Sequence, residues 1–141
     1  MIAVDTNILV YAHREEMPLH PKALERLTEM AENHIPWAIP VFCLTEFLRV
    51  VTHPKVFDPP SSTQDGLEAV GELIRSPSLV LLHPAEMFWK VFDEIVRQSG
   101  ARGNLIFDAQ IAAVCRENGV NDLLSEDRDF TRFDGITLHT L

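Results

Sequence analysis

The chain opens with "MIAVDTNILVYA", residues 1–12, in which a polar triplet interrupts an apolar run. Residues 2–5 predict a short buried strand, and the apolar residues that resume at Ile8 predict a helix as far as His13. Asp5 therefore stands at the end of a strand in the core. An ionised carboxylate in that position costs free energy unless it has a partner, so Asp5 calls for a chemical explanation.

The rest of the chain alternates short apolar segments with amphipathic ones. Further strands are predicted over residues 35–41, 79–83, 121–125 and 135–140. Further helices are predicted over residues 20–34, 41–52, 63–75, 84–99 and 105–118, with Thr63 as the N-cap of the third of these. Several strands are apolar without alternation, which is typical of a mainly parallel sheet covered by helices on both faces. The predicted fold class is therefore α/β.

Length and composition restrict the function further. The 141 residues are the length of one ordinary domain, so we expect a single domain over residues 1–141. The net charge is −9, with 21 acidic against 12 basic residues, which argues against non-specific adhesion to nucleic acid. It does not exclude an enzyme that binds phosphates through metal ions held by some of those acids.

The expected compartment is the cytoplasm. No apolar run approaches the roughly 20 residues of a membrane span, and the N-terminus lacks a signal-peptide pattern, so no membrane partner is expected. Cys43 and Cys115 lie far apart with no C-x-x-C pairing. Neither a disulfide framework nor a thiolate zinc site is therefore indicated.

Four acidic positions stand out from the solvated acids of the surface. Asp5 and Asp127 come after apolar strands, whereas Glu46 and Asp108 lie in early helical turns with apolar neighbours. In an open parallel sheet, helices begin at the edge where the strands end, so the four side chains can converge there. Carboxylates brought close together raise each other's pKa, and a hard divalent cation relieves this. Oxygen-only ligands favour magnesium or manganese.

Each acid also has a structural alternative. Asp5 could cap the following helix, and Glu46 could form a surface ion pair with Arg49 three residues on. Asp108 could be an ordinary acid near a helix N-terminus, and Asp127 or its neighbour two residues on could cap a turn. The occurrence of all four at the same predicted edge favours a functional cluster.

Three segments and one glutamate resemble a known family. "AVDTNILVYA" (3–12), Glu46, "FDAQIAA" (107–113) and "LLSEDRDF" (123–130) resemble the PIN-domain family, and most of all the VapC-type toxins of bacterial toxin–antitoxin pairs. The resemblance implies a three-layer α/β/α sandwich with a central, mainly parallel five-stranded sheet. It also implies an endoribonuclease that depends on Mg²⁺ or Mn²⁺, with one or two ions.

The resemblance assigns roles by position. It implies a catalytic and metal-binding quartet of Asp5, Glu46, Asp108 and Asp127, supported by Thr6, Asn7, Ser125 and Asp129. The family often has threonine where this chain has Ser125, and serine keeps the hydroxyl. Arg102 and Arg128 are candidates to bind the RNA backbone, although Arg128 could instead pair with Asp129 or Glu126.

The resemblance also implies partners. These are an RNA substrate (tRNA, rRNA or mRNA), an antitoxin of the VapB type whose tail lies in the active-site groove, and a second copy in a homodimer. One alternative is a non-catalytic PIN-like module that only binds a partner. Another is a phosphatase of the haloacid dehalogenase type, which Asn7 disfavours because that chemistry needs a second acid there; no lysine follows Lys90 either.

Overall fold

The computed structural model describes all 141 residues, and five short strands form one sheet at its centre. The strands are β1 (Ile2–Val4), β2 (Trp37–Pro40), β3 (Leu79–Leu82), β4 (Asp122–Leu124) and β5 (Thr137–His139). Their order is β3-β2-β1-β4-β5, and every neighbouring pair is parallel. The first strand is therefore the central one, and the chain adds strands first on one side of it and then on the other.

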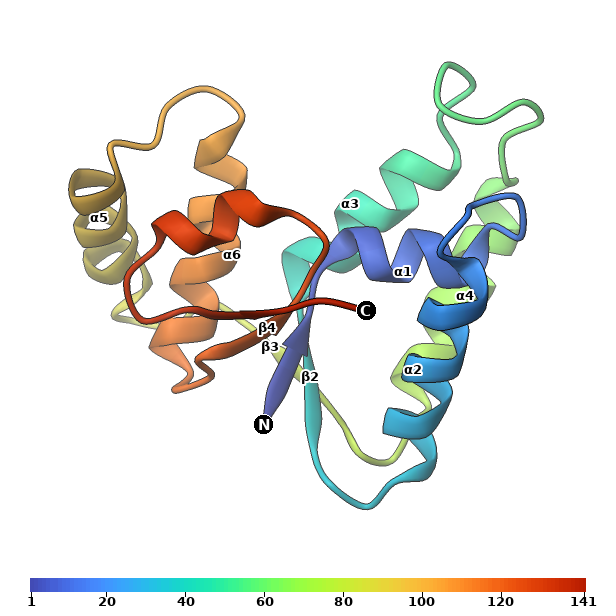
Figure 1. Ribbon diagram of the computed structural model, residues 1–141, viewed down its shortest axis with the longest axis horizontal. Helices are drawn as coiled ribbons and strands as arrows, with labels where there is room; N and C mark the ends of the chain where they lie inside the picture. Colours follow the sequence, from blue (N-terminus) through green and yellow to red (C-terminus); the bar gives the residue numbers. More distant parts are fainter.

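Helices cover both faces of the sheet (Figure 1). On one side lie α1 (Thr6–His13), α2 (His20–Glu32), α3 (Val41–Val51) and α4 (Thr63–Ile74), and on the other lie α5 (Phe88–Ser99) and α6 (Leu105–Glu117). A 3₁₀ turn, η1 (Arg128–Arg132), links β4 to β5. The predicted three-layer α/β/α sandwich is confirmed, with a sheet that is parallel throughout.

The core explains why the strands show no polar alternation. Residues Trp37 to Pro40 are all buried because helices cover both sides of β2. On α6, the buried face consists largely of small side chains, with Ala109, Ala112 and Ala113 all fully buried. Small residues let a helix lie close to the sheet, which places the start of α6 next to the carboxyl ends of the central strands.

Two predicted boundaries differ from the structure by one residue: the end of the first strand and the N-cap of the fourth helix. β1 ends at Val4, and Asp5 is the N-cap of α1, so its carboxylate accepts from the first backbone N–H of the helix. The N-cap of α4 is Ser62, whose hydroxyl oxygen accepts from the N–H of Asp65 at 3.0 Å. The prediction of Thr63 as the cap is therefore wrong by one position.

The helix predicted over residues 84–99 begins only at Phe88. The preceding residues form a turn whose backbone N–H groups at Ala85 and Met87 donate to the Glu117 carboxylate at 2.9 and 3.0 Å. This tie to the end of α6 is distant in sequence, so local periodicity does not reveal it. None of the helices has the length and apolar character that a membrane crossing requires.

The cap of α4 allows a direct test of this local correction. We expect Ser62→Ala to lower the free energy of unfolding by about 1 kcal/mol, because it leaves an N–H of the first turn without its acceptor. Thr63→Ala is the matched control and should change stability little, since residue 63 is already inside the helix. Urea denaturation of both variants measures the difference. A larger loss in Thr63→Ala would contradict the assignment.

Candidate active site

The site lies at the carboxyl ends of the two central strands, β1 and β4. Asp5 directly follows β1, and Ser125 directly follows β4. The backbone N–H of Asp5 donates to the carbonyl of Leu124 at 3.0 Å, so the two strand ends are joined. In open parallel sheets, this edge at the point where strand order reverses is where ligands bind.

Asp5 is a buried carboxylate with two strong donors, and only 5% of the residue is exposed. Its Oδ1 accepts from the N–H of Thr6 at 2.7 Å and its Oδ2 accepts from the hydroxyl of Ser125 at 2.6 Å. Burial raises the pKa of Asp5 to about 6, although these two hydrogen bonds lower it. The side chain thus caps α1, which is the structural alternative that the sequence left open. Its ionised form is still disfavoured, because the two hydrogen bonds do not fully offset the loss of hydration.

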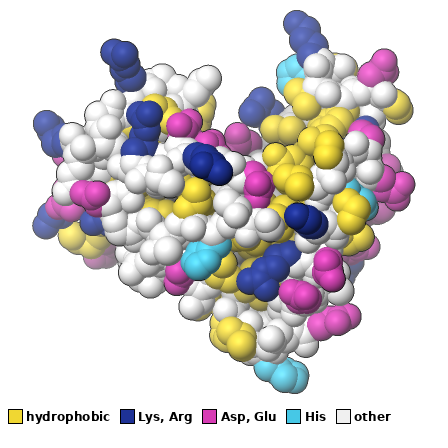
Figure 2. All heavy atoms as spheres, viewed as in Figure 1, with side chains coloured by type: hydrophobic (Ala, Val, Ile, Leu, Met, Phe, Trp, Pro, Cys, Tyr) yellow, Lys and Arg dark blue, Asp and Glu magenta, His cyan; other side chains and the backbone are white.

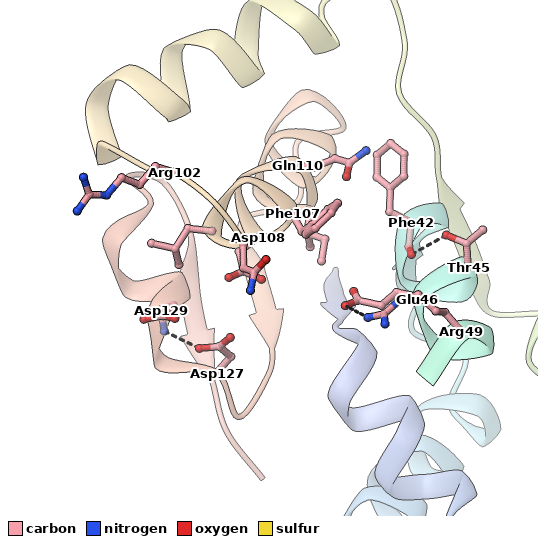
Figure 3. Close-up of a pocket in the computed structure, with 13 residues that line it drawn as sticks. Phe42, Thr45, Glu46, Arg49, Arg102, Phe107, Asp108, Gln110, Asp127 and Asp129 are labelled. Carbon is pink, nitrogen blue, oxygen red and sulfur yellow. Dashed lines mark hydrogen bonds and ion pairs between the residues drawn. The ribbon is translucent and has the colours of Figure 1, made fainter. Parts of the chain in front are cut away.

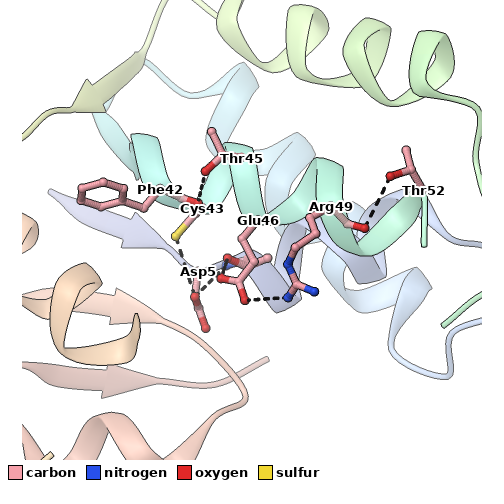
Figure 4. Close-up of polar contacts among 8 residues, drawn as sticks. Asp5, Phe42, Cys43, Thr45, Glu46, Arg49 and Thr52 are labelled. Carbon is pink, nitrogen blue, oxygen red and sulfur yellow. Dashed lines mark hydrogen bonds and ion pairs between the residues drawn. The ribbon is translucent and has the colours of Figure 1, made fainter. Parts of the chain in front are cut away.

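Glu46 approaches Asp5 from α3 (Figure 4). Its Oε2 accepts from the hydroxyl of Thr6 at 3.0 Å, and its Oε1 lies 3.6 Å from a guanidinium nitrogen of Arg49. The ion pair that the sequence left open is therefore present. Because Arg49 is largely exposed, this pair contributes little to stability and leaves Glu46 free to bind other groups.

Three further carboxylates gather opposite Glu46. Asp108 projects from the first turn of α6, and Asp127 and Asp129 come from the segment after β4. Each offers an oxygen within 4.8 Å of the others. Burial, followed by the charges of Asp127, Asp5, Asp129 and Glu46, raises the pKa of Asp108 to about 7. The close approach of like charges therefore destabilises the fully ionised state.

Asp127 also has a structural role in η1. Its Oδ1 accepts from the N–H of Asp129 at 2.9 Å, so it caps the 3₁₀ turn. The sequence indicated only a supporting role for Asp129, but the structure places it in the tightest carboxylate group. The turn itself was not predicted, and it is this turn that brings Asp129 back toward Asp108.

Ser125 connects the acids to one another. It is fully buried, and its hydroxyl donates to Asp5 while it accepts from the amide of Asn7 at 3.1 Å and from the N–H of Asp127 at 3.0 Å. The Asn7 carbonyl oxygen in turn lies 3.4 Å from the N–H of Glu126. One hydroxyl thus fixes the position of two acidic segments, and the Asn7 amide is occupied by a structural contact.

Four of the acids line an open groove of about 1220 Å³, which we call the acidic groove (Figure 3), whereas Asp5 lines a smaller hollow beside it. One wall carries Glu46 and Arg49 from α3, and the other carries Asp108, Asp127 and Asp129. Figure 2 shows the molecule hollowed between its two helical layers, with acidic side chains gathered there. A polymer can therefore reach the carboxylates from solvent.

The basic candidates separate in the structure. Arg102 lines the acidic groove, whereas Arg128 is exposed on η1, lines neither this groove nor the smaller hollow beside it, and forms no ion pair. The sequence indicates Arg49 only as an ion-pair partner of Glu46, yet Arg49 lines the groove as well. Its spacing of three residues from Glu46 on one helix face was the signal that could have identified it.

The donor set fits a hard divalent cation. The three side chains that converge within 4.8 Å are all carboxylates, and burial together with the charges of the other acids raises the pKa of Asp108. The nearby thiols do not compete as ligands, because burial raises the pKa of Cys115 to about 12 and that of Cys43 well above its usual range. Magnesium or manganese therefore suits these residues better than zinc.

Comparison with known proteins identifies the family. The model of the PIN domain matches residues 2–136. Ribonuclease VapC43 of Mycobacterium tuberculosis is 40% identical over 133 residues, which are 94% of this chain and 90% of the relative. Ribonuclease VapC48 of the same species is 31% identical over 138 residues, with 95% and 92% covered.

Solved structures share the fold at lower identity. The VapBC2 complex of Rickettsia felis, bound to a promoter DNA fragment, has a TM-score of 0.70 at 19% identity and covers 100% of this chain and 99% of its own. VapC20 of Mycobacterium tuberculosis, a toxin that cleaves the sarcin-ricin loop, has a TM-score of 0.68 at 21% identity, with 96% and 98% covered. The extent of the family match and the identity to VapC43 show that this chain belongs to the PIN-domain family.

Proposed function

We propose that the chain is an endoribonuclease that depends on Mg²⁺ or Mn²⁺ and acts as the toxin of a VapBC-type pair. The observation that carries this proposal is the set of three carboxylates within 4.8 Å, with Asp5 and Glu46 beside it, in a groove open to solvent. Relatives at 40% and 31% identity are named ribonucleases. The phosphatase alternative is set aside because the Asn7 amide is engaged with Ser125 and no second acid takes its place.

The proposed ligands are the acids of this edge. Asp5, Glu46, Asp108 and Asp127 hold one or two ions, and Asp129 adds a carboxylate to the group of Asp108 and Asp127. A bound divalent ion supplies a water of lowered pKa and stabilises the charge that develops on the phosphate.

The remaining residues keep the acids in place. The Ser125 hydroxyl and the Thr6 N–H orient the Asp5 carboxylate, while the Thr6 hydroxyl orients Glu46. Arg102 and Arg49 line the groove, where a guanidinium pairs with RNA phosphates by charge-assisted hydrogen bonds. Arg128 lies outside the groove, so we assign it at most a contact farther along the RNA.

The proposed partners use the same groove. A VapB-type antitoxin that lays a basic tail over the carboxylates would neutralise them and block the RNA, and a homodimer would present two such grooves. The proposed substrate is a cellular tRNA, rRNA or mRNA, and the proposed compartment is accordingly the cytoplasm. The non-catalytic alternative has no specific observation in its favour.

The first test is cleavage of cellular RNA. Antitoxin-free protein is incubated with total RNA in Mg²⁺, in Mn²⁺ or in EDTA, and new 5′ ends are mapped by sequencing. We expect discrete cuts that require the metal, because the carboxylates need it to bind a phosphate. A folded protein that makes no cuts with either metal would point to the partner-binding module.

Substitution of single acids tests the site. We expect Asp5→Asn and Asp108→Asn each to slow cleavage by about 100-fold or more, because loss of metal-based charge stabilisation removes several kcal/mol from the transition state. Asp134→Asn is the matched control, since Asp134 is exposed and lines neither hollow. Rates come from single-turnover cleavage of the mapped RNA. Wild-type rates in Asp5→Asn or Asp108→Asn would refute the assignment.

The clustered charges also predict a pH dependence of stability without metal. The raised pKa of Asp108, about 7, means that the folded protein binds this proton more tightly than the unfolded chain, whose aspartate pKa is about 3.9. The stabilisation is therefore complete below about pH 4 and is lost as the pH rises through about 7.

Asp108→Asn removes this titration. In EDTA we expect it to match wild type at pH 4 and to be about 1 to 2 kcal/mol more stable at pH 8, less than the pKa shift alone implies because water screens the half-exposed carboxyl. Urea denaturation at both pH values gives the difference. A variant less stable than wild type at pH 8 in EDTA would count against the clustered-acid picture.

A further inference from the structure

A second hollow of about 320 Å³ lies beside the acidic groove and shares Glu46, Asp108 and Asp127 with it. Asp5, Thr6 and Asn7 line it as well, and the rest of its wall is apolar. The apolar part comes from α1, from the α1–α2 and α3–α4 connections and from the end of α3, and consists of Val10, Tyr11, Met17, Val50, Val56 and Phe57. One cavity thus joins a carboxylate cluster to an aromatic and aliphatic recess.

The far wall is held in place by the rest of the protein. The Arg14 guanidinium lies over the Phe57 ring, 4.3 Å from its centroid. Arg14 also donates to the carbonyl of Pro59 at 2.8 Å and to the hydroxyl of Ser61 at 3.0 Å, so it ties the α3–α4 connection to the end of α1. The recess is therefore formed before any ligand arrives.

Tyr11 contributes a ring and a hydroxyl to this recess. The ring is only partly buried, and no hydrogen bond within the protein engages the hydroxyl. Burial and the charges of Glu126, Asp5 and Asp127 raise the pKa of this phenol, so it remains a donor at neutral pH. A ligand in the recess can therefore contact an aromatic face and a hydrogen-bonding group on one side chain.

We propose that this recess, which we call the base pocket, receives one unstacked nucleobase of the RNA, next to the phosphate held at the acids. This inference rests on the proposed function and names the part of the substrate that the site selects. Single-stranded RNA is recognised by stacking splayed bases on aromatic side chains and by hydrogen bonds to their edges. The volume lies at the lower end of the range for small-molecule sites.

The charge pattern favours a nucleotide over an apolar peptide side chain. With a divalent cation held by the carboxylates at its mouth, the recess would fit an occupant that places a flat, neutral group inside it and an anion next to the cation. A nucleotide has both parts in one unit, whereas a hydrophobic side chain supplies only the first. The phosphates on either side of the base are directed to the acidic groove, because that is where Arg49 and Arg102 lie.

The test measures RNA binding without cleavage. Four homopolymeric RNA oligonucleotides and an abasic phosphodiester of the same length are titrated by fluorescence anisotropy, with Ca²⁺ in place of Mg²⁺. We expect wild type to bind at least one homopolymer about tenfold more tightly than the abasic strand, because stacking of one base contributes on this order. Binding does not require turnover, so the readout stands apart from the cleavage experiment.

Variants assign that difference to the base pocket. Tyr11→Ala removes the ring, and Val56→Trp fills the recess from its exposed rim without touching the core. In both, the preference over the abasic strand should shrink to less than about threefold. Tyr11→Phe should keep most of it, because the ring remains. Trp89→Ala is the control, since Trp89 is an exposed aromatic residue that lines neither hollow.

Two outcomes would overturn the inference. One is a preference for the homopolymer over the abasic strand that has the same size in wild type, Tyr11→Ala and Val56→Trp. The other is unchanged RNA binding with lost affinity for the cognate antitoxin, which would assign the recess to that protein. If wild type cuts no RNA yet shows the base preference, the proposed function fails while the pocket assignment survives.

Discussion

The arrangement of the site depends on the hydrogen bond from the Ser125 hydroxyl to the buried carboxylate of Asp5. It joins the ends of the two central strands through their side chains, just as the backbone bond from Asp5 to Leu124 joins them through the main chain. Two donors make the burial of Asp5 tolerable, but they do not cancel the desolvation, and the pKa of the carboxyl stays raised to about 6. The protein thus keeps at its centre a carboxylate whose ionised form a bound cation would stabilise.

The remaining acids are placed by elements that approach this bond from different directions. Thr6 links Asp5 to Glu46 on α3, and Ser125 links it to Asp127. Asp108 comes from the opposite helical layer, where the small residues of α6 allow a close approach to the sheet. Because Asp5, Glu46 and Asp108 are fixed on three different elements and Asp127 and Asp129 on a fourth segment, repulsion among them is not fully relieved by moving one loop. A bound divalent cation would therefore raise the free energy of unfolding, because it relieves this repulsion, and would also bind the phosphate of the substrate.

Strand ends and helix faces are visible in the sequence, whereas long-range contacts are not. Asp5 and Asp127 can be recognised in the sequence because each follows an apolar run, and Asp108 because it has apolar neighbours in an early helical turn. The position of Asp129 depends on a 3₁₀ turn too short to show periodicity, and the late start of α5 depends on Glu117, from the end of a different helix. The recess at Phe57 depends on Arg14, which resembles an ordinary surface charge in the sequence. Local patterns thus predict the acids, while side chains that bridge distant segments determine the shape of the groove and recess.

The overall charge explains why the groove and the recess are needed for affinity in an enzyme that acts on RNA. With a net charge of −9, the chain lacks the general attraction by which basic proteins hold nucleic acid. Under the proposed function, affinity has to come from a few places: the ions held by the carboxylates, the two arginines of the acidic groove and the base pocket. An RNA that contacts only one of these places binds weakly, because the surrounding acidic surface repels its phosphates. Repulsion everywhere else therefore converts a small number of contacts into selectivity for a particular RNA segment.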